Sequence, residues 1–344
     1  MAEKEIVETS EAEIAVHWGE EDYFHPSPKF IAQANITDEG IYQRFSLDNF
    51  PNCFKEYADL LDWYEYWHTI LDTSDAPCWK WFVGGKINAS YNCVDRHLAK
   101  NRNKTALHFV PELLEEKTEH ITFQELYVRV NEMAALLRDF AGLKAGDRVT
   151  LNLPMTPELP ITLLACARLG APHNVVFGGF SPEALSDRIN DSDSKLLITA
   201  DGAWRRGKVV PLKENADAAL EASPGVEHVL VVNRVSDPTE VSMKEGRDHW
   251  WHLEMEKSEG EVVEPEHLDS EHPLYILYTS GTTGKPKGLL HTTGGYLVGA
   301  HTTTKYVFDL KDTDTYWCAA DVGWVTGHSY IVYGPLSNGA TSIM

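Results

Sequence analysis

The stretch that decides the fold reads Tyr278-Thr279-Ser280-Gly281-Thr282-Thr283-Gly284-Lys285-Pro286-Lys287-Gly288. It directly follows the apolar run 274–278, which predicts a buried strand. Glycines let backbone N–H groups turn toward an anion, hydroxyls donate hydrogen bonds, and lysines supply positive charge. The stretch therefore predicts a polyphosphate-binding loop, and a flexible polar linker is the plainer alternative.

This loop differs from a Walker A loop in two ways. Lys285 is followed by Pro286, where the Walker A pattern has Ser or Thr. The apolar residues Leu289 and Leu290 then predict a strand, where a Walker A loop opens a helix. A different class of ATP-binding loop is therefore indicated.

Upstream of the loop, short apolar runs alternate with helical patterns. Thr122 and Glu125 have the spacing of a capping box and predict the start of a helix. We expect strands at 148–153, 171–177, 195–199 and 226–232, and helices at 157–169, 181–190 and 212–222. This alternation predicts βαβ units and an α/β fold, with a mostly parallel sheet covered by helices on both faces. The acidic stretch 237–272 is interpreted as a surface excursion.

The N-terminal part has a different composition. Residues 1–20 are polar and acidic and predict a mobile tail. Six Trp and Tyr residues lie between positions 63 and 81, and the pattern over 57–71 predicts a helix packed onto the main body. A ligand platform is the alternative for this aromatic segment.

Length and composition exclude several classes of protein. The 344 residues, 43% of them hydrophobic, supply a sizeable core, and five cysteines without CxxC spacing favour neither a disulfide framework nor a zinc site. No signal peptide or membrane-spanning run is recognised, so we expect a soluble, cytoplasmic protein. The formal net charge of −22 argues against nucleic acid and anionic membrane as partners. Adaptation to a high-salt cytosol is an alternative to an ordinary acidic protein.

The loop sequence resembles the phosphate-binding signature of the adenylate-forming superfamily. Three further segments, 81–97, 176–181 and 320–330, are similar to segments of the acetyl-CoA synthetase branch, in the same order. The resemblance runs from about residue 24 to residue 344. It implies a domain layout with an N-terminal segment at 21–90 and the AMP-binding, adenylate-forming domain at 91–344.

The resemblance also implies roles for individual residues. The ATP phosphates would be bound by Thr279, Ser280, Gly281, Thr282, Thr283, Gly284, Lys285 and Lys287. The acyl pocket would be formed by Trp324, Val325 and Thr326, with Trp324 and His328 as core side chains in the alternative reading. CoA would be bound by Arg205, Arg206, Gly207, Lys208, Thr326, Gly178 and Gly179, and a solvated basic face is the alternative for 200–208. Lys208 stands where bacterial relatives carry a second arginine, so it keeps the charge and loses the bidentate fork.

The reaction implied is the ATP-dependent activation of acetate to acetyl-adenylate, followed by transfer to CoA, with ATP, Mg²⁺ and CoA as cofactors and substrates. The adenylation lysine and the metal ligands of the family would lie outside these 344 residues. We therefore expect an incomplete adenylate-forming domain, inactive alone, with a strand at 339–344 whose edge is exposed and a downstream polypeptide as a possible complement. A propionyl-CoA synthetase, an amino-acid adenylation domain and a non-catalytic nucleotide-binding protein remain as alternatives.

Overall fold

The computed structural model describes residues 25–235, 240–279 and 286–344. The chain divides into two units, residues 1–39 and 40–344, and each is described by itself. The described part of the first unit holds helix α2 (Pro28–Gln33), whose N-cap Ser27 accepts a hydrogen bond from the backbone N–H of Phe30 at 3.2 Å. The expected acidic tail at 1–20 lies outside the described residues.

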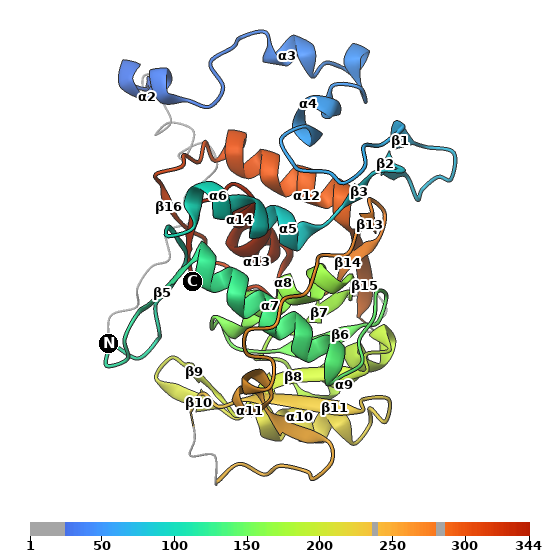
Figure 1. The fold of residues 1–344 in the computed structure, drawn as a ribbon, viewed down its shortest axis with the longest axis vertical. Helices are drawn as coiled ribbons and strands as arrows, with labels where there is room; N and C mark the ends of the chain where they lie inside the picture. The colour runs from blue at the N-terminus through green and yellow to red at the C-terminus, as the bar shows by residue number, and fades with distance from the viewer. Residues whose placement is uncertain (1–24, 236–239, 280–285) are drawn as a thin grey trace, which may run out of the picture. The chain divides into compact units, whose positions relative to one another are not determined.

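The second unit is built on a seven-stranded sheet (Figure 1). Its strands, from one edge to the other, are β12 (Asp248–Trp250), β11 (His228–Val232), β8 (Leu196–Ala200), β6 (Val149–Asn152), β7 (His173–Val175), β14 (Pro273–Thr279) and β15 (Lys287–Thr292). Neighbouring strands are parallel except β14 and β15. The predicted α/β class and the predicted strands are thereby confirmed.

Helices cover both faces of this sheet. They are α7 (Phe123–Asp139), α8 (Glu158–Leu169), α9 (Pro182–Ser192) and α10 (Leu212–Leu220). Ile198 of β8 packs in the cluster that contains α7 and α8, whereas its neighbour Leu197 packs in the cluster that contains α9 and α10. Because successive strand residues point to opposite faces, this division shows two buried faces.

Local sequence explains where the central helices begin and end. Thr122 and Glu125 form the predicted capping box at the start of α7. Helix α8 ends at Gly170, which adopts φ +70°, a left-handed conformation that glycine tolerates best. Asn88 donates to the carbonyls of Ala167 and Arg168 at 3.0 and 3.1 Å and so satisfies free carbonyls at that helix end.

A four-stranded sheet has the order β16 (Thr315–Trp317), β17 (Thr341–Ile343), β4 (Thr105–Phe109) and β5 (Glu119–Thr122). The expectation of an exposed strand edge at 339–344 is wrong. Ser342 of β17 is paired with Tyr316 on one side and with Leu107 on the other. The backbone of β17 is therefore satisfied on both sides, and β16 and β5 are the edges.

The aromatic segment also differs from the prediction. The helix expected at 57–71 is replaced by α4 (Phe54–Ala58) and, further on, by β1 (Thr69–Asp72), which pairs with β2 (Lys80–Val83). The indole N–H of Trp63 donates to the carbonyl of Ala58 at 2.9 Å, where α4 ends. Aromatic residues favour extended backbone, and in this segment Trp63 and Trp67 pack against the main core.

The acidic stretch 237–272 is more than a surface excursion. It contributes β12 to the main sheet, α11 (Trp251–Glu256) directly after β12, and β13 (Leu268–Asp269), which pairs with β3 (Lys86–Ile87). The Asp248 carboxylate is completely buried and bonded to Arg247 and Lys213 at 2.5 and 2.9 Å. Asp248 thus acts as a buried counter-ion, although the composition of this stretch suggested that its acidic side chains face solvent.

The other described elements complete the second unit. They are α3 (Ile41–Arg44), η1 (Leu47–Asn49), α5 (Ala89–Cys93), η2 (Asp95–His97), α6 (Leu98–Asn101), β9 (Ala203–Arg205), β10 (Lys208–Val210), α12 (Thr293–Thr302), η4 (Thr303–Val307), α13 (Val325–Gly327), η5 (His328–Tyr333) and α14 (Gly334–Ser337). Within the ranges that the structure describes, none of the helices has the length and apolar character needed to cross a membrane.

Candidate functional site

A cleft of about 730 Å³ contains residues from both the predicted phosphate loop and the predicted acyl pocket. We call it the Thr279 cleft. Its walls include Thr279, Leu289, Trp324, Val325 and Thr326. The structure therefore brings together side chains that lie more than forty positions apart in the sequence.

Only the two ends of the predicted phosphate loop are described. Thr279 ends β14 and Lys287 begins β15, and the two residues face each other in the antiparallel register. Thr279 lines the cleft, whereas Lys287 is exposed and does not. The residues predicted between them, Ser280, Gly281, Thr282, Thr283, Gly284 and Lys285, lie outside the described residues.

The predicted acyl residues lie at the start of α13, with Trp324 as its N-cap and Val325 and Thr326 inside the helix. Trp324 is 50% exposed and Val325 48% exposed, so neither is a core side chain. The backbone N–H of Trp324 donates to the Asp321 carbonyl at 3.0 Å. A Cβ atom on Gly327 would lie 2.1 Å from that same carbonyl oxygen, so this tight turn requires glycine at position 327.

His328 has a different environment from Trp324. Its side chain is fully buried, and burial lowers its pKa to about 4, so the imidazole is neutral at pH 7. It stacks on His173 with ring centroids 5.5 Å apart. His328 is therefore a core side chain, as the alternative reading had it.

A second cleft, of about 600 Å³, shares Trp324 with the first. We call it the Arg205 cleft. It is lined by three of the predicted CoA residues, Gly178, Gly179 and Arg205. The Arg205 guanidinium lies 4.6 Å from the ring centre of Phe177, and a Cβ on Gly179 would come within 2.5 Å of that ring. Glycine at position 179 thus allows Phe177 and Arg205 to approach the chain closely.

The other predicted CoA residues belong to the tip of a hairpin. Arg206 and Gly207 have φ of +53° and +71°, and they join β9 to β10 as a two-residue turn. The Gly207 N–H donates to Glu112 at 2.8 Å. Arg206, Gly207 and Lys208 are exposed and do not line the cleft, while Thr326 lines the Thr279 cleft.

The clefts contain ionisable residues that the sequence analysis missed, namely Glu112 and Asp321 in the Arg205 cleft and Arg188 and His291 in the Thr279 cleft. Asp321 lines the Arg205 cleft, and burial raises its pKa while the charge of Arg205 acts in the opposite direction. Arg188 of α9 lines the Thr279 cleft, with its guanidinium 4.6 Å from the Phe180 ring and 5.6 Å from the Tyr278 ring. Asp321 lies inside the quoted segment 320–330 and was within reach of the sequence, whereas no spacing marks Arg188.

The described residues form no cluster of side chains that could bind Mg²⁺. Among these residues no group of three or more His, Cys, Asp or Glu side chains is placed to hold a metal ion. The arginine, hydroxyl and aromatic side chains of the two clefts suit phosphate groups and an apolar moiety, and the carboxyl groups of Glu112 and Asp321 also line the Arg205 cleft.

Comparison with known proteins agrees with this geometry. The family model described as AMP-binding enzyme matches residues 94–344, and the model described as acetyl-coenzyme A synthetase N-terminus matches residues 41–93. The chain is 53% identical over 326 residues to the acetyl-coenzyme A synthetase of Gemmatimonas aurantiaca and 53% identical over 323 residues to that of Rubrobacter xylanophilus. It is 51% identical over 310 residues to that of Pyrobaculum arsenaticum.

These alignments cover 93%, 93% and 88% of this chain and 49%, 49% and 46% of the three relatives. The chain thus spans about half the length of the curated relatives it matches. With the family model covering residues 94–344, the two adjoining clefts and the α/β sheet beneath them belong to a member of the AMP-binding enzyme family.

Proposed function

We propose that this chain contributes the ATP-phosphate, acyl and CoA contacts of an AMP-forming acetate–CoA ligase. The observation that carries the proposal is the pair of clefts that meet at Trp324. One cleft adjoins the phosphate loop and the other contains Arg205, so an activated acyl group at the junction would be within reach of a thiol from the second cleft. The chain spans half the length of its relatives, so the complete reaction is proposed for the whole protein.

In the first step, the acetate carboxylate attacks the α-phosphorus of ATP, and pyrophosphate leaves. Residues 279–287 would bind the outgoing phosphates, and the Arg188 guanidinium would add positive charge in the same cleft. Mg²⁺ would neutralise phosphate charge when it is bound with ATP. Among the described residues no group of His, Cys, Asp or Glu side chains is placed to hold it.

In the second step, the CoA thiol attacks the acyl carbonyl and AMP leaves. Gly178, Gly179 and Arg205 would position CoA, with Arg206, Gly207 and Lys208 at the hairpin tip as its outer phosphate contacts. Thr326 would lie next to the thiol end, and Val325 would limit the length of the acyl group. Each additional methylene changes binding by only about 1–3 kcal/mol in such a pocket, so some activity on propionate is expected.

We also propose the layout and setting that accompany this function. Residues 21–90 would form the N-terminal segment and residues 91–344 the adenylate-forming domain. Acetate, ATP and CoA would be the partners, in a cytoplasmic compartment, and a further polypeptide segment would complete the site. The net charge of −22 disfavours nucleic acid and anionic membranes as partners.

The proposal is tested first by CoA binding to the chain itself. Arg205→Ala should weaken binding at least about tenfold, because a charge-assisted hydrogen bond contributes about 1.5–3 kcal/mol. Arg138→Ala, on the exposed side of α7, is the matched control and should leave the dissociation constant unchanged. If Arg205→Ala binds CoA with the same dissociation constant as Arg138→Ala, the Arg205 cleft does not bind CoA.

The adenylation step is tested by acetate-dependent exchange of pyrophosphate into ATP. The assay uses the chain together with the remaining half of the Gemmatimonas relative. Lys285→Ala and Gly284→Val should abolish exchange, and Val325→Ala should raise the rate with propionate or butyrate relative to acetate. A panel of acids separates acetate, propionate and amino-acid activation, and nucleotide binding without any exchange would favour a non-catalytic protein.

A further inference from the structure

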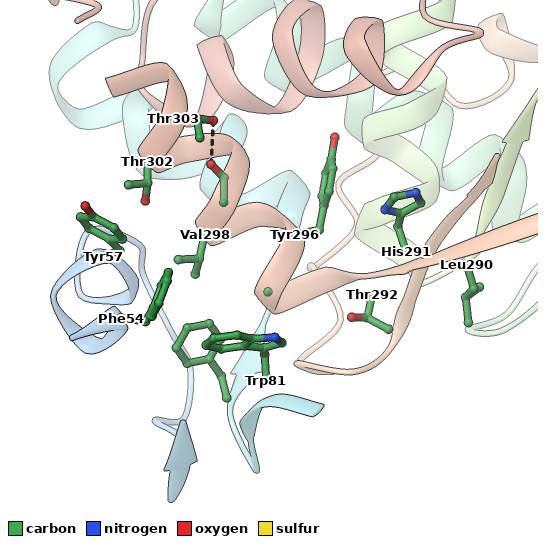
Figure 2. Close-up of a pocket in the computed structure, with 13 residues that line it drawn as sticks. Phe54, Tyr57, Trp81, Leu290, His291, Thr292, Tyr296, Val298, Thr302 and Thr303 are labelled. Atoms are coloured by element: carbon green, nitrogen blue, oxygen red, sulfur yellow. Dashed lines mark hydrogen bonds between the residues drawn. The ribbon is translucent and has the colours of Figure 1, made fainter. Parts of the chain in front are cut away.

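A third cavity, of about 410 Å³, shares His291 with the Thr279 cleft and contains none of the residues to which a role is assigned above. We call it the Phe54 pocket. Figure 2 shows Phe54, Tyr57 and Trp81 on one side of it and Val298 and Thr302 of α12 on the other. The two sides come from the ranges matched by the two different family models. Neither the family models nor the proposed reaction assigns it a ligand.

Aromatic rings form one wall of the Phe54 pocket. The rings of Phe54 and Trp81 are 5.1 Å apart at 66°, and those of Phe54 and Tyr57 are 5.9 Å apart at 82°. These are edge-to-face arrangements, which a further aromatic ring can extend favourably. A cavity of this volume is within the range that holds small organic ligands.

The lining carries no formal charge. All thirteen lining residues belong to the described part of the chain, and none of them is Asp, Glu, Lys or Arg. The lining residue His291 is neutral at pH 7, because burial lowers its pKa. Transfer of a charged ligand into such a site would be unfavourable, so nucleotides, CoA and carboxylates do not suit it.

One hydroxyl group in the lining lacks a partner. Thr302 is only 7% exposed, and its Oγ1 has no hydrogen-bond partner among the described residues. Figure 2 shows the Thr302 side chain at the Tyr57 end of the pocket. A buried polar group without a partner is costly, and a ligand hydroxyl at this end would relieve that cost.

We propose that the Phe54 pocket is a binding site for an uncharged aromatic molecule that carries one hydroxyl group. The aromatic wall binds the ring, the absence of charge from the lining selects against ions, and Thr302 pairs with the hydroxyl. The proposal does not rest on the ligase reaction, although the pocket adjoins the Thr279 cleft at His291.

Three fluorinated probes of similar size test the proposal on the chain itself. They are 4-fluorophenol, fluorobenzene and 4-fluorobenzoate, and ligand-observed ¹⁹F line broadening measures their dissociation constants. We expect 4-fluorophenol to bind about three- to tenfold more tightly than fluorobenzene, as one hydrogen bond allows. We expect 4-fluorobenzoate to bind most weakly. Tightest binding by the benzoate, or no saturable binding by any probe, would overturn the proposal.

Gly299 provides a variant that fills the pocket. It lines the pocket in α12, and a Cβ built on it meets no atom within 4 Å. Gly299→Leu should therefore enter open space and strengthen the helix, since Leu is a better helix former than Gly. Binding of 4-fluorophenol should be lost. Gly225→Leu, which also has open space and lies outside the pocket, is the matched control and should retain it.

Thr302→Val tests the hydroxyl with little change of shape. It removes an unpartnered buried group, so the melting temperature should stay equal or rise. The preference for 4-fluorophenol over fluorobenzene should then disappear, while fluorobenzene still binds. Probe binding that persists in Gly299→Leu, or a preference that persists in Thr302→Val, would contradict the assignment of this pocket.

Discussion

The clearest prediction concerns the buried ion pair between Arg168 and Asp95. Arg168 lies in α8 with its side chain 1% exposed, and Asp95 is 13% exposed. Two parallel hydrogen bonds of 2.8 Å join the guanidinium to both carboxylate oxygens, and Nε donates to the Val263 carbonyl at 2.5 Å. Asp95→Asn keeps the size of the side chain and removes the negative charge that is paired with Arg168.

The magnitude follows from the geometry. For unit charges about 4 Å apart, the attraction at an effective dielectric constant of about 20 is about 4 kcal/mol. Removing one partner of a buried pair typically costs about 3–5 kcal/mol, since the other charge stays buried. Total stabilities are about 5–15 kcal/mol, so Asp95→Asn should remove a large part of the free energy of unfolding.

Urea unfolding followed by tryptophan fluorescence measures this loss. A double-mutant cycle with Arg168→Met should show that the double variant is less destabilised than the sum of the single variants. Asp139→Asn is the control, because it breaks an ion pair whose partners are 42% and 59% exposed and should cost less than about 1 kcal/mol. A loss for Asp95→Asn no larger than that of the control would refute the reasoning.

Three further predictions follow from the same structure. Gly327→Ala should cost about 1–3 kcal/mol and weaken ligand binding in both clefts, because its Cβ would overlap the Asp321 carbonyl; unchanged melting and CoA binding would contradict this. Burial lowers the pKa of His97 and His328 to about 4, so the unfolded state binds more protons between pH 4 and 6.5, and stability should fall as the pH drops through that window. Urea unfolding at several pH values measures the fall, at about 1.4 kcal/mol per pH unit for each histidine, and His328→Gln should reduce it. If the net charge of −22 reflects adaptation to salt, molar KCl should raise the melting temperature, and indifference to KCl would reject that idea.

The sequence was most informative where a pattern is local. Alternating apolar runs and helical periods predicted the strands and helices of the main sheet, and Thr122 with Glu125 predicted the start of α7. Such signals depend on neighbouring residues only. The bounds of α8, α9 and α10 therefore agree with the expected ranges to within a few residues.

Features that depend on distant contacts were not predictable in the same way. The aromatic segment leaves the helical state because Trp63 and Trp67 pack against a core formed by later residues. The sequence around Asp248 suggested a solvated acidic stretch, whereas the structure buries this residue against the distant Lys213. Arg188 resembles any arginine on a helix, and only the packing of α9 against β15 brings it to the Thr279 cleft.

The position of the Arg205 cleft follows from the spatial order of the strands in the sheet, and this order cannot be deduced from the order of the strands along the chain. From β6 the chain proceeds to β7 on one side, whereas from β8 it proceeds to β11 on the other side. In open parallel sheets, ligands bind where adjacent strands send their connections in opposite directions, outside their carboxyl ends. Residues 153–155, which follow β6, and residues 203–205, which follow β8, both line this cleft. The strand reversal therefore explains, without any reference to relatives, why a ligand cleft lies next to Arg205.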